Sequence, residues 1–237
     1  MYKHSKFNYS DQADNLTVTY LDALGMILRY LPKDAKILEI GCGNGFMLKA
    51  LLDRGYNNLY GIEPSQDAIL KADDRIKDRI IVDVLRKGLY KSESFDLIFF
   101  FQTFDHIQYP MDFLSICYNL LSLGGNILAM NHDIKSFSAR VLGEKSPIID
   151  IEHMYLYSKE TINKVFVKAG FRPFKIYSPK STISFRHLIW LLPIPKMIKL
   201  RLLNFKGRFT DFLLNQSIII QLGNLCIMAK KTGSNSK

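Results

Sequence analysis

A glycine-rich turn, Glu39-Ile-Gly41-Cys-Gly43-Asn-Gly45, limits the possible folds of this chain more than any other feature. It separates an apolar run that predicts a strand from a stretch that predicts a helix. Glycines at such a junction let the backbone turn sharply and let a ligand approach without a Cβ in the way. The position three residues after Gly43 is Phe46, which disfavours a dinucleotide site of the NAD type. No Gly-Lys-Ser/Thr follows, so a phosphate-binding P-loop is excluded.

Apolar segments of strand length alternate with helical patterns along the chain, which favours an α/β fold with a doubly wound, mostly parallel sheet. The run from Phe95 to Phe101 is continuously apolar apart from Asp96, as expected for a strand that is buried on both faces. The sequence predicts helices over 15–31, 45–53, 66–71, 111–121 and 159–169, and strands over 36–40, 58–62, 79–82, 95–101, 126–130, 171–177 and 224–230.

An acidic residue lies where a nucleoside would need one. Glu63 comes 22 residues after Gly41, at the end of the second predicted strand. A carboxylate in that place can accept hydrogen bonds from both hydroxyls of a ribose. The turn and the spaced acid together predict a nucleoside cofactor.

Four segments resemble motifs of class I S-adenosylmethionine-dependent methyltransferases. The turn is similar to motif I, Gly61-Ile-Glu63-Pro64-Ser65 to motif II, and the segment from Ser94 to Ile98 to motif IV. The Gly-Gly pair at 124–125 resembles the loop before the fifth strand. The resemblance runs from about 31 to 130. It implies a Rossmann-like methyltransferase fold with seven strands, and here with a helical lid inserted between strands six and seven.

The resemblance also implies the residues that bind S-adenosylmethionine and its product, S-adenosylhomocysteine. The glycines would face the methionine part, Glu63 the ribose and Pro64 the adenine. An acid after the third strand, here Asp83, would reach the adenine amine. The implied set is Glu39, Gly41, Cys42, Gly43, Gly45, Glu63, Pro64, Asp83, Val84, Phe101 and Gln102.

Methyl transfer to a hydroxyl needs a group that removes the acceptor proton, which is usually a His, Asp or Glu. His106 follows the fourth strand directly and is the first candidate base, while His132 and His153 could share or replace that role. A structural role remains open for each of the three. No pair of these histidines has ligand spacing on one helix, so we expect no metal.

The positive charge is concentrated near the carboxyl end. The net charge is +10, from 32 Lys+Arg and 22 Asp+Glu, and residues 180–237 carry nine units of it. Residues 181–221 interleave these cations with apolar side chains. This pattern is typical of a surface that meets anionic head groups, of a lid that holds a phosphate, or of an ordinary amphipathic helix pair. Nucleic acid is disfavoured as a partner, because basic charge alone is weak evidence.

We therefore expect one methyltransferase domain over 1–237. Its parts would be an N-terminal helical segment (1–30), a cofactor-binding half (31–130), an acceptor side with the basic lid (131–221), and a last strand and tail (222–237). The favoured activity is O-methylation of a small molecule that is a sugar, a lipid-linked glycan or quinone-like. RNA or protein methylation, and a non-catalytic membrane-associated scaffold, are the alternatives. Three distant cysteines and no signal peptide indicate a cytoplasmic protein, with contact at the inner face of the membrane left open.

Overall fold

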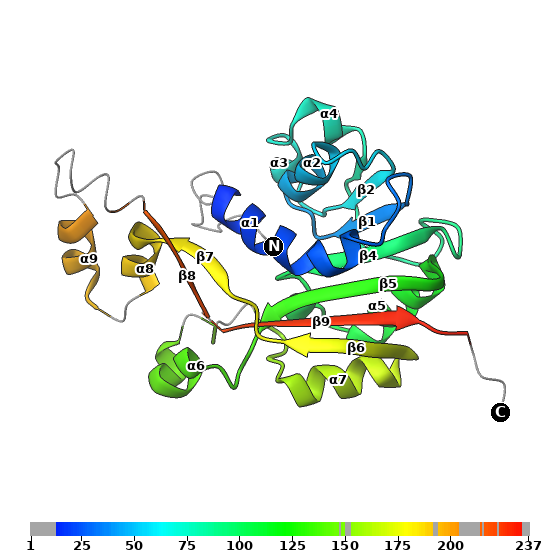
Figure 1. Cartoon of the computed structure of the whole chain (residues 1–237). Coiled ribbons are helices and arrows are strands. Elements are labelled where there is room, and N and C mark those ends of the chain that lie inside the picture. Colours follow the sequence, from blue (N-terminus) through cyan, green and yellow to red (C-terminus); the bar gives the residue numbers. More distant parts are fainter. Residues whose placement is uncertain are drawn as a thin grey trace.

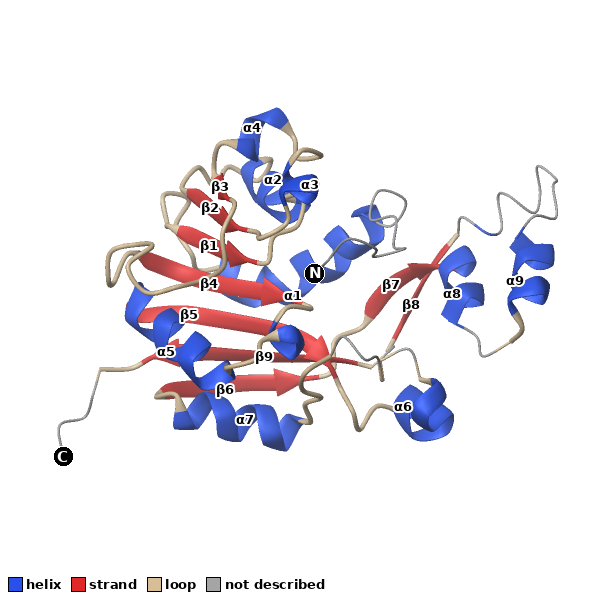
Figure 2. Cartoon of the chain, turned by 180° about the vertical axis from the view of Figure 1, so that it is seen from behind, coloured by secondary structure: helices blue, strands red, loops and turns tan. Residues whose placement is uncertain are grey.

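The centre of the structure, a computed structural model, is a seven-stranded sheet in the order β3-β2-β1-β4-β5-β9-β6 (Figures 1 and 2). The structure describes residues 13–146, 148–149, 153–191, 194–203, 214, 216–221 and 223–233. The strands of this sheet are β1 (Ile37–Ile40), β2 (Leu59–Ile62), β3 (Ile80–Ile81), β4 (Phe95–Phe101), β5 (Leu121–His132), β6 (Phe171–Tyr177) and β9 (Asn224–Lys231). The prediction of a doubly wound α/β sheet is confirmed.

Strand direction decides which side chains meet. The pairs β1–β2, β1–β4, β2–β3 and β4–β5 are parallel, whereas β9 runs antiparallel to both β5 and β6. The carboxyl ends of β1, β2, β4 and β5 therefore lie at one edge of the sheet. In open α/β sheets this edge is where ligands bind.

Helices cover both faces of the sheet, and β4 is buried between them. Leu97 and Phe99 pack in one core cluster with α1 (Ala13–Leu28) and α2 (Phe46–Leu52). Ile98 and Phe100 pack in the other cluster with α5 (Pro110–Leu120) and α7 (Lys159–Lys168). All four β4 side chains are fully buried, which explains why the sequence here is a continuous apolar run rather than an alternating one.

Local capping fixes several helix starts as the sequence predicts. The Ser65 hydroxyl accepts a hydrogen bond from the Ala68 N–H at the start of α3 (Gln66–Ile69). Ser158 and Thr161 form a reciprocal capping box at the start of α7. Such side chains satisfy backbone N–H groups that have no partner within the helix.

The segment between β6 and β9 differs from the predicted helical lid. It contains a second, two-stranded antiparallel sheet, β7 (Ser181–Ser184) with β8 (Ser217–Ile220), as well as α8 (Phe185–Leu191) and α9 (Lys196–Leu203). Both views show α8 and α9 projecting beyond the edge at which β5 ends (Figures 1 and 2). Three charged positions of this segment, Lys206, Arg208 and Asp211, lie outside the described residues.

Four short helices have no counterpart in the sequence-based prediction. These are α4 (Asp74–Lys77), a 3-10 turn at Phe104–His106, α6 (Phe137–Leu142) and a second 3-10 turn at Gly143–Lys145. Each is too short to give a helical periodicity in the sequence. In the described part of the chain no helix has both the length and the apolar character to cross a membrane.

Candidate active site

The glycine turn after β1 forms a backbone cradle at the carboxyl edge of the sheet. The N–H groups of Gly41 and Cys42 both donate to the Ile62 carbonyl, at 2.8 and 3.2 Å, which ties the turn to the end of β2. A Cβ at Gly43, where φ is +55°, would meet no protein atom within 4 Å. The backbone of Gly43 thus borders open space that a ligand can occupy.

Gly41, unlike Gly43, is packed against a side chain, which leads to a prediction on stability. At φ +72° an alanine Cβ would lie 2.4 Å from Thr103 Oγ1. Thr103 cannot move freely, because that hydroxyl donates to the Phe101 carbonyl at 3.0 Å. We expect Gly41→Ala to lower the free energy of unfolding by about 2–4 kcal/mol, from the left-handed backbone and the overpacking together.

Gly55→Ala is the matched control, to be measured by urea unfolding alongside Gly41→Ala. Gly55 also has a positive φ, +85°, but an added Cβ there meets nothing within 4 Å. Gly55→Ala should lower the free energy of unfolding only by the backbone contribution, about 1–2 kcal/mol. Equal losses in the two variants would show that the contact with Thr103 does not restrict position 41.

Glu63 directly follows β2 and turns its carboxylate toward the glycine turn rather than to bulk water. The Gly43 N–H donates to Oε2 at 2.8 Å, and the Ser65 N–H donates to Oε1 at 2.9 Å. A carboxylate has about four lone-pair positions, so two remain for a diol such as a ribose. The predicted ribose contact fits this geometry.

Glu39 and Cys42 are the buried side chains of the glycine turn. Glu39 is 3% exposed, and its Oε2 accepts no hydrogen bond from the described residues. Burial, and then the charge of Glu63, raise the pKa of this carboxyl well above its usual range. A cationic amino group near the turn would satisfy the unpaired oxygen. Burial also raises the pKa of the Cys42 thiol far above its ordinary value, so this side chain stays neutral and fills space.

The residues predicted around the adenine lie at the same edge. Pro64 is exposed beside Glu63, and Asp83 follows β3 by two residues. The Asp83 carboxylate accepts hydrogen bonds from the Val84 N–H at 2.8 Å and from Arg86 Nε at 2.9 Å. The hydrogen bond from Val84 contributes most to lowering the pKa of Asp83 below its ordinary value. An adenine contact by Asp83 or Val84 stays a prediction.

The end of β4 turns the chain across the edge of the sheet. The Phe101 ring stacks on Tyr20 of α1 with centroids 4.0 Å apart, so it is part of the core. Gln102 adopts φ +49°, which is uncommon for a residue with a side chain. Its amide Nε2 donates to Asn224 Oδ1 at 3.0 Å. This turn places Thr103 beside Gly41 of the glycine cradle, and the 3-10 turn with Asp105 and His106 follows it.

Three histidines and one aspartate gather at the same edge of the sheet. Asp105 is 1% exposed and lies at the centre. Its Oδ2 is 2.8 Å from His132 Nδ1 and 3.7 Å from His153 Nε2, and its Oδ1 is 3.8 Å from His106 Nε2. All three histidines proposed from the sequence are thus brought together, and we call these four side chains the Asp105 cluster.

The fold explains how such distant positions meet. His132 ends β5, and the isolated bridge between Asp133 and Tyr157 holds the segment after β5 beside the segment that carries His153. The Asp105 carbonyl accepts hydrogen bonds from the N–H groups of Met154 and Tyr155, at 2.8 and 3.1 Å. Sequence reasoning named the histidines but missed Asp105 as their shared partner, because its only sequence signal was its place before His106.

The electrostatics of the cluster favour an ionised aspartate. Burial alone would raise the pKa of Asp105, yet the hydrogen bond from His132 and the nearby imidazoles bring it below its ordinary value. Burial lowers the pKa of His153 and outweighs the attraction of Asp105. An ionised carboxylate only accepts hydrogen bonds, so the His132 Nδ1–H donates to it. This tautomer leaves the His132 Nε2 lone pair able to accept a proton.

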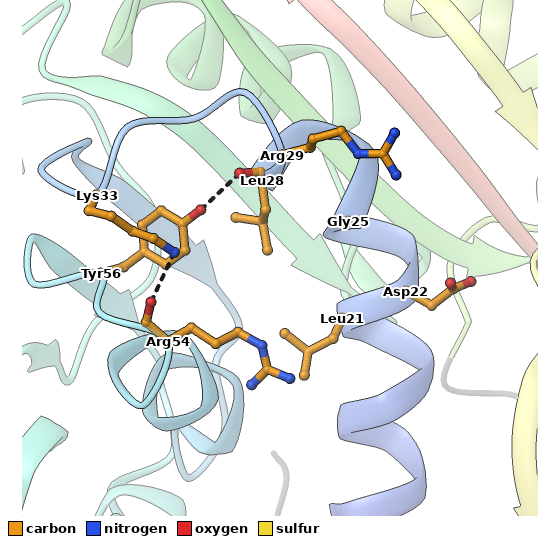
Figure 3. Close-up of a pocket in the computed structure, with 8 residues that line it drawn as sticks. All are labelled: Leu21, Asp22, Gly25, Leu28, Arg29, Lys33, Arg54 and Tyr56. Atoms are coloured by element: carbon orange, nitrogen blue, oxygen red, sulfur yellow. Dashed lines mark hydrogen bonds between the residues drawn. The ribbon is translucent and has the colours of Figure 1, made fainter.

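A separate groove lies away from this edge. It has a volume of about 530 Å³ and lies between α1 and the loop that follows α2 (Figure 3). The Tyr56 hydroxyl donates to the Leu28 carbonyl at 3.0 Å, and Lys33 Nζ donates to the Arg54 carbonyl at 2.9 Å. None of the predicted cofactor or catalytic residues lines this groove, so we assign the site to the carboxyl edge of the sheet.

Comparison with known proteins gives a family match and two kinds of relatives. A family model described as a methyltransferase domain matches residues 14–175. The tRNA U34 carboxymethyltransferase of Cellvibrio japonicus is 29% identical over 170 residues, which are 67% of this chain and 52% of the relative. The enzyme of the same name from Vibrio vulnificus is 26% identical over 157 residues, 63% of this chain and 49% of the relative. The chain thus spans about half the length of these curated relatives.

Solved structures agree on the fold. A SAM-dependent methyltransferase from Archaeoglobus fulgidus superposes with a TM-score of 0.63 at 18% identity, and the match covers 96% of this chain and 100% of that one. At this identity the likeness concerns the architecture, which matches the Rossmann-like sheet predicted from the sequence.

These relatives correct one expectation. Nucleic acid was disfavoured as a partner, but both curated relatives carry a tRNA in their name. The physical reason is that basic charge does not distinguish an RNA backbone from a lipid head group or a phosphorylated small molecule, since all present phosphate. The expectations of a phosphorylated or lipid-linked acceptor and of membrane contact are not carried forward.

Proposed function

The chain belongs to the methyltransferase-domain family of class I S-adenosylmethionine-dependent enzymes, and from this premise we propose that it methylates an oxygen of a tRNA nucleotide. Its cofactor is S-adenosylmethionine, which supplies a methyl group already activated by the neighbouring sulfonium. The protein therefore has to orient the acceptor, exclude competing water and remove the acceptor proton.

The Asp105–His132 pair is the observation that supports an oxygen atom as the methyl acceptor. Its hydrogen bond of 2.8 Å lies at the same edge as Glu63 and the glycine cradle. A hydroxyl loses its proton on methylation and gains from a base within hydrogen-bond reach. We infer that Asp105 orients His132 and that His132 Nε2 accepts that proton. The first base candidate in the sequence, His106, then belongs to the same cluster, with its Nε2 3.8 Å from Asp105 Oδ1.

The tRNA acceptor is supported by the names of the curated relatives, and the charge distribution is compatible with it. Residues 180–203 contain Lys180, Arg186, Lys196, Lys199 and Arg201 and no acidic residue. The helices α8 and α9 of this segment project beyond the edge of the sheet at which β5 ends (Figures 1 and 2). Cations placed beside a reaction site can hold the phosphates that flank a nucleotide.

The test uses the full chain, S-adenosylmethionine labelled on the methyl group, and purified total tRNA. We expect label in the tRNA, with U34 the first position to examine by nuclease digestion and mass spectrometry, as the relatives' name suggests. Raising the salt concentration should weaken tRNA binding steeply, because phosphate contacts release counterions. Cofactor binding without label in any tRNA would contradict the proposal.

A further inference from the structure

The Asp105 cluster contains an electrostatic conflict that the proposed base does not resolve. Asp105 is 1% exposed, and its Oδ1 accepts no hydrogen bond from the described residues. An ionised carboxylate so deeply buried is costly unless each oxygen faces a donor or a cation. One hydrogen bond, from His132 to Oδ2, satisfies only part of this need.

The orientation of His153 sharpens the conflict. Its Nδ1 lies 2.9 Å from the Ile148 carbonyl, and because a carbonyl only accepts, Nδ1 carries the proton of that bond. In the neutral ring the lone pair is then on Nε2, which lies 3.7 Å from Asp105 Oδ2. A lone pair and a carboxylate oxygen repel each other unless a hydrogen-bond donor or a cation lies between them. An Nδ1–H bonded to a backbone carbonyl is also how proteins orient a metal-binding imidazole.

We propose that Asp105, His132 and His153 form a binding site for one divalent transition-metal ion of the zinc type. Their donor atoms all lie within 4.8 Å of one another. Imidazole nitrogens with one carboxylate oxygen are a common ligand set for zinc, cobalt and nickel, whereas magnesium prefers oxygen ligands. His106, whose Nε2 is 3.8 Å from Asp105 Oδ1, is in reach to complete the set.

The distances suit such an ion after small side-chain movements. Two ligands at zinc bond lengths and a tetrahedral angle are roughly 3.4 Å apart. The observed separations from Asp105 Oδ2, 2.8 Å to His132 and 3.7 Å to His153, lie on either side of this value. The three residues come from the ends of β4 and β5 and from the segment before α7, so the fold itself holds them together.

Metal binding and the base role are alternative states of the cluster, a consequence that rests on the proposed function. As a base, His132 carries its proton on Nδ1 and accepts another on Nε2. Coordination through Nδ1 displaces that proton, which passes through solvent to Nε2, so Nε2 no longer accepts one. A bound metal ion would therefore stop methyl transfer without changing the affinity for the cofactor.

The test measures binding of Zn²⁺ to the full chain after treatment with a chelator and its removal, by calorimetry and by metal analysis, with Co²⁺ absorption as a probe of tetrahedral geometry. We expect one ion per chain and no competition from millimolar Mg²⁺. His153→Gln should weaken binding about 100-fold or more and leaves the Asp105–His132 hydrogen bond in place. His187→Gln, which removes a histidine of α8 outside the cluster, should bind like the unaltered chain.

Asp105→Asn is the second variant, and thermal unfolding checks that each variant is folded. Absence of stoichiometric Zn²⁺ binding, or equal binding by the His153 and His187 variants, would overturn the metal site. Neither result depends on activity, so both leave the proposed function standing. Zn²⁺ bound at the cluster with methyl transfer unchanged would instead contradict the assignment of His132 as the base.

Discussion

Glu63→Ala is expected to weaken S-adenosylmethionine binding by about 100-fold or more. A hydrogen bond to a charged group contributes about 1.5–3 kcal/mol, and the carboxylate has room for two ribose hydroxyls. The change also removes the acceptor for the N–H groups of Gly43 and Ser65, so the cradle loses its anchor. Calorimetric titration of the purified chain with the cofactor measures the effect.

Two further variants separate the causes of that loss. Glu63→Gln keeps the shape and one acceptor oxygen, so it should retain more affinity than the alanine variant. Asp67→Asn removes an exposed acid in the first turn of α3 and should leave the affinity unchanged. Cofactor affinity preserved in Glu63→Ala would show that the ribose is held elsewhere.

Asp105→Asn is expected to lower the rate of methyl transfer by about 10²–10⁴-fold, the range typical of a lost general base. An amide can donate to His132 Nδ1 and so favour the tautomer whose Nε2 carries a proton. Cofactor affinity should be unchanged, because Glu63 and the glycine turn are untouched. Single-turnover rates with labelled cofactor, at saturating tRNA, measure the chemical step.

The pairing of Asp105 with His132 can be tested by combining variants. His132→Gln should cost about as much as Asp105→Asn, and the double variant little more, because two residues that act as one unit are not additive. Asp112→Asn, in the exposed first turn of α5, is the control. Losses that multiply in the double variant would contradict a shared role.

Local patterns in the sequence carry much of the fold. The apolar run at 95–101 predicted a strand buried on both faces, and the caps at Ser65 and Ser158 predicted two helix starts. These features depend on neighbours a few residues apart, which is why they can be read from the chain. The two strands β7 and β8 could not, since each is four residues long and its partner lies more than 30 positions away.

Gly41 and Glu63 show, within the site, how far the sequence alone can lead. Their spacing indicated a nucleoside site, and the structure adds that the Glu63 carboxylate already bonds to the turn. The nature of the acceptor could not be read from charge, because every phosphate-bearing partner attracts lysine and arginine alike.

The sequence by itself determined the succession along the chain of the seven main-sheet strands and five of the helices, the glycine turn and the acid that follows the second strand. These depend on periodicity, on backbone freedom and on spacing along the chain. Only the tertiary structure decided that Asp105, His132 and His153 lie together, although they are 27 and 21 positions apart in sequence. Their meeting follows from β4 and β5 ending at the same edge and from the bridge that folds the later segment back beside them. Contacts between residues so distant in sequence leave no periodic pattern, so they can be seen only in the three-dimensional structure.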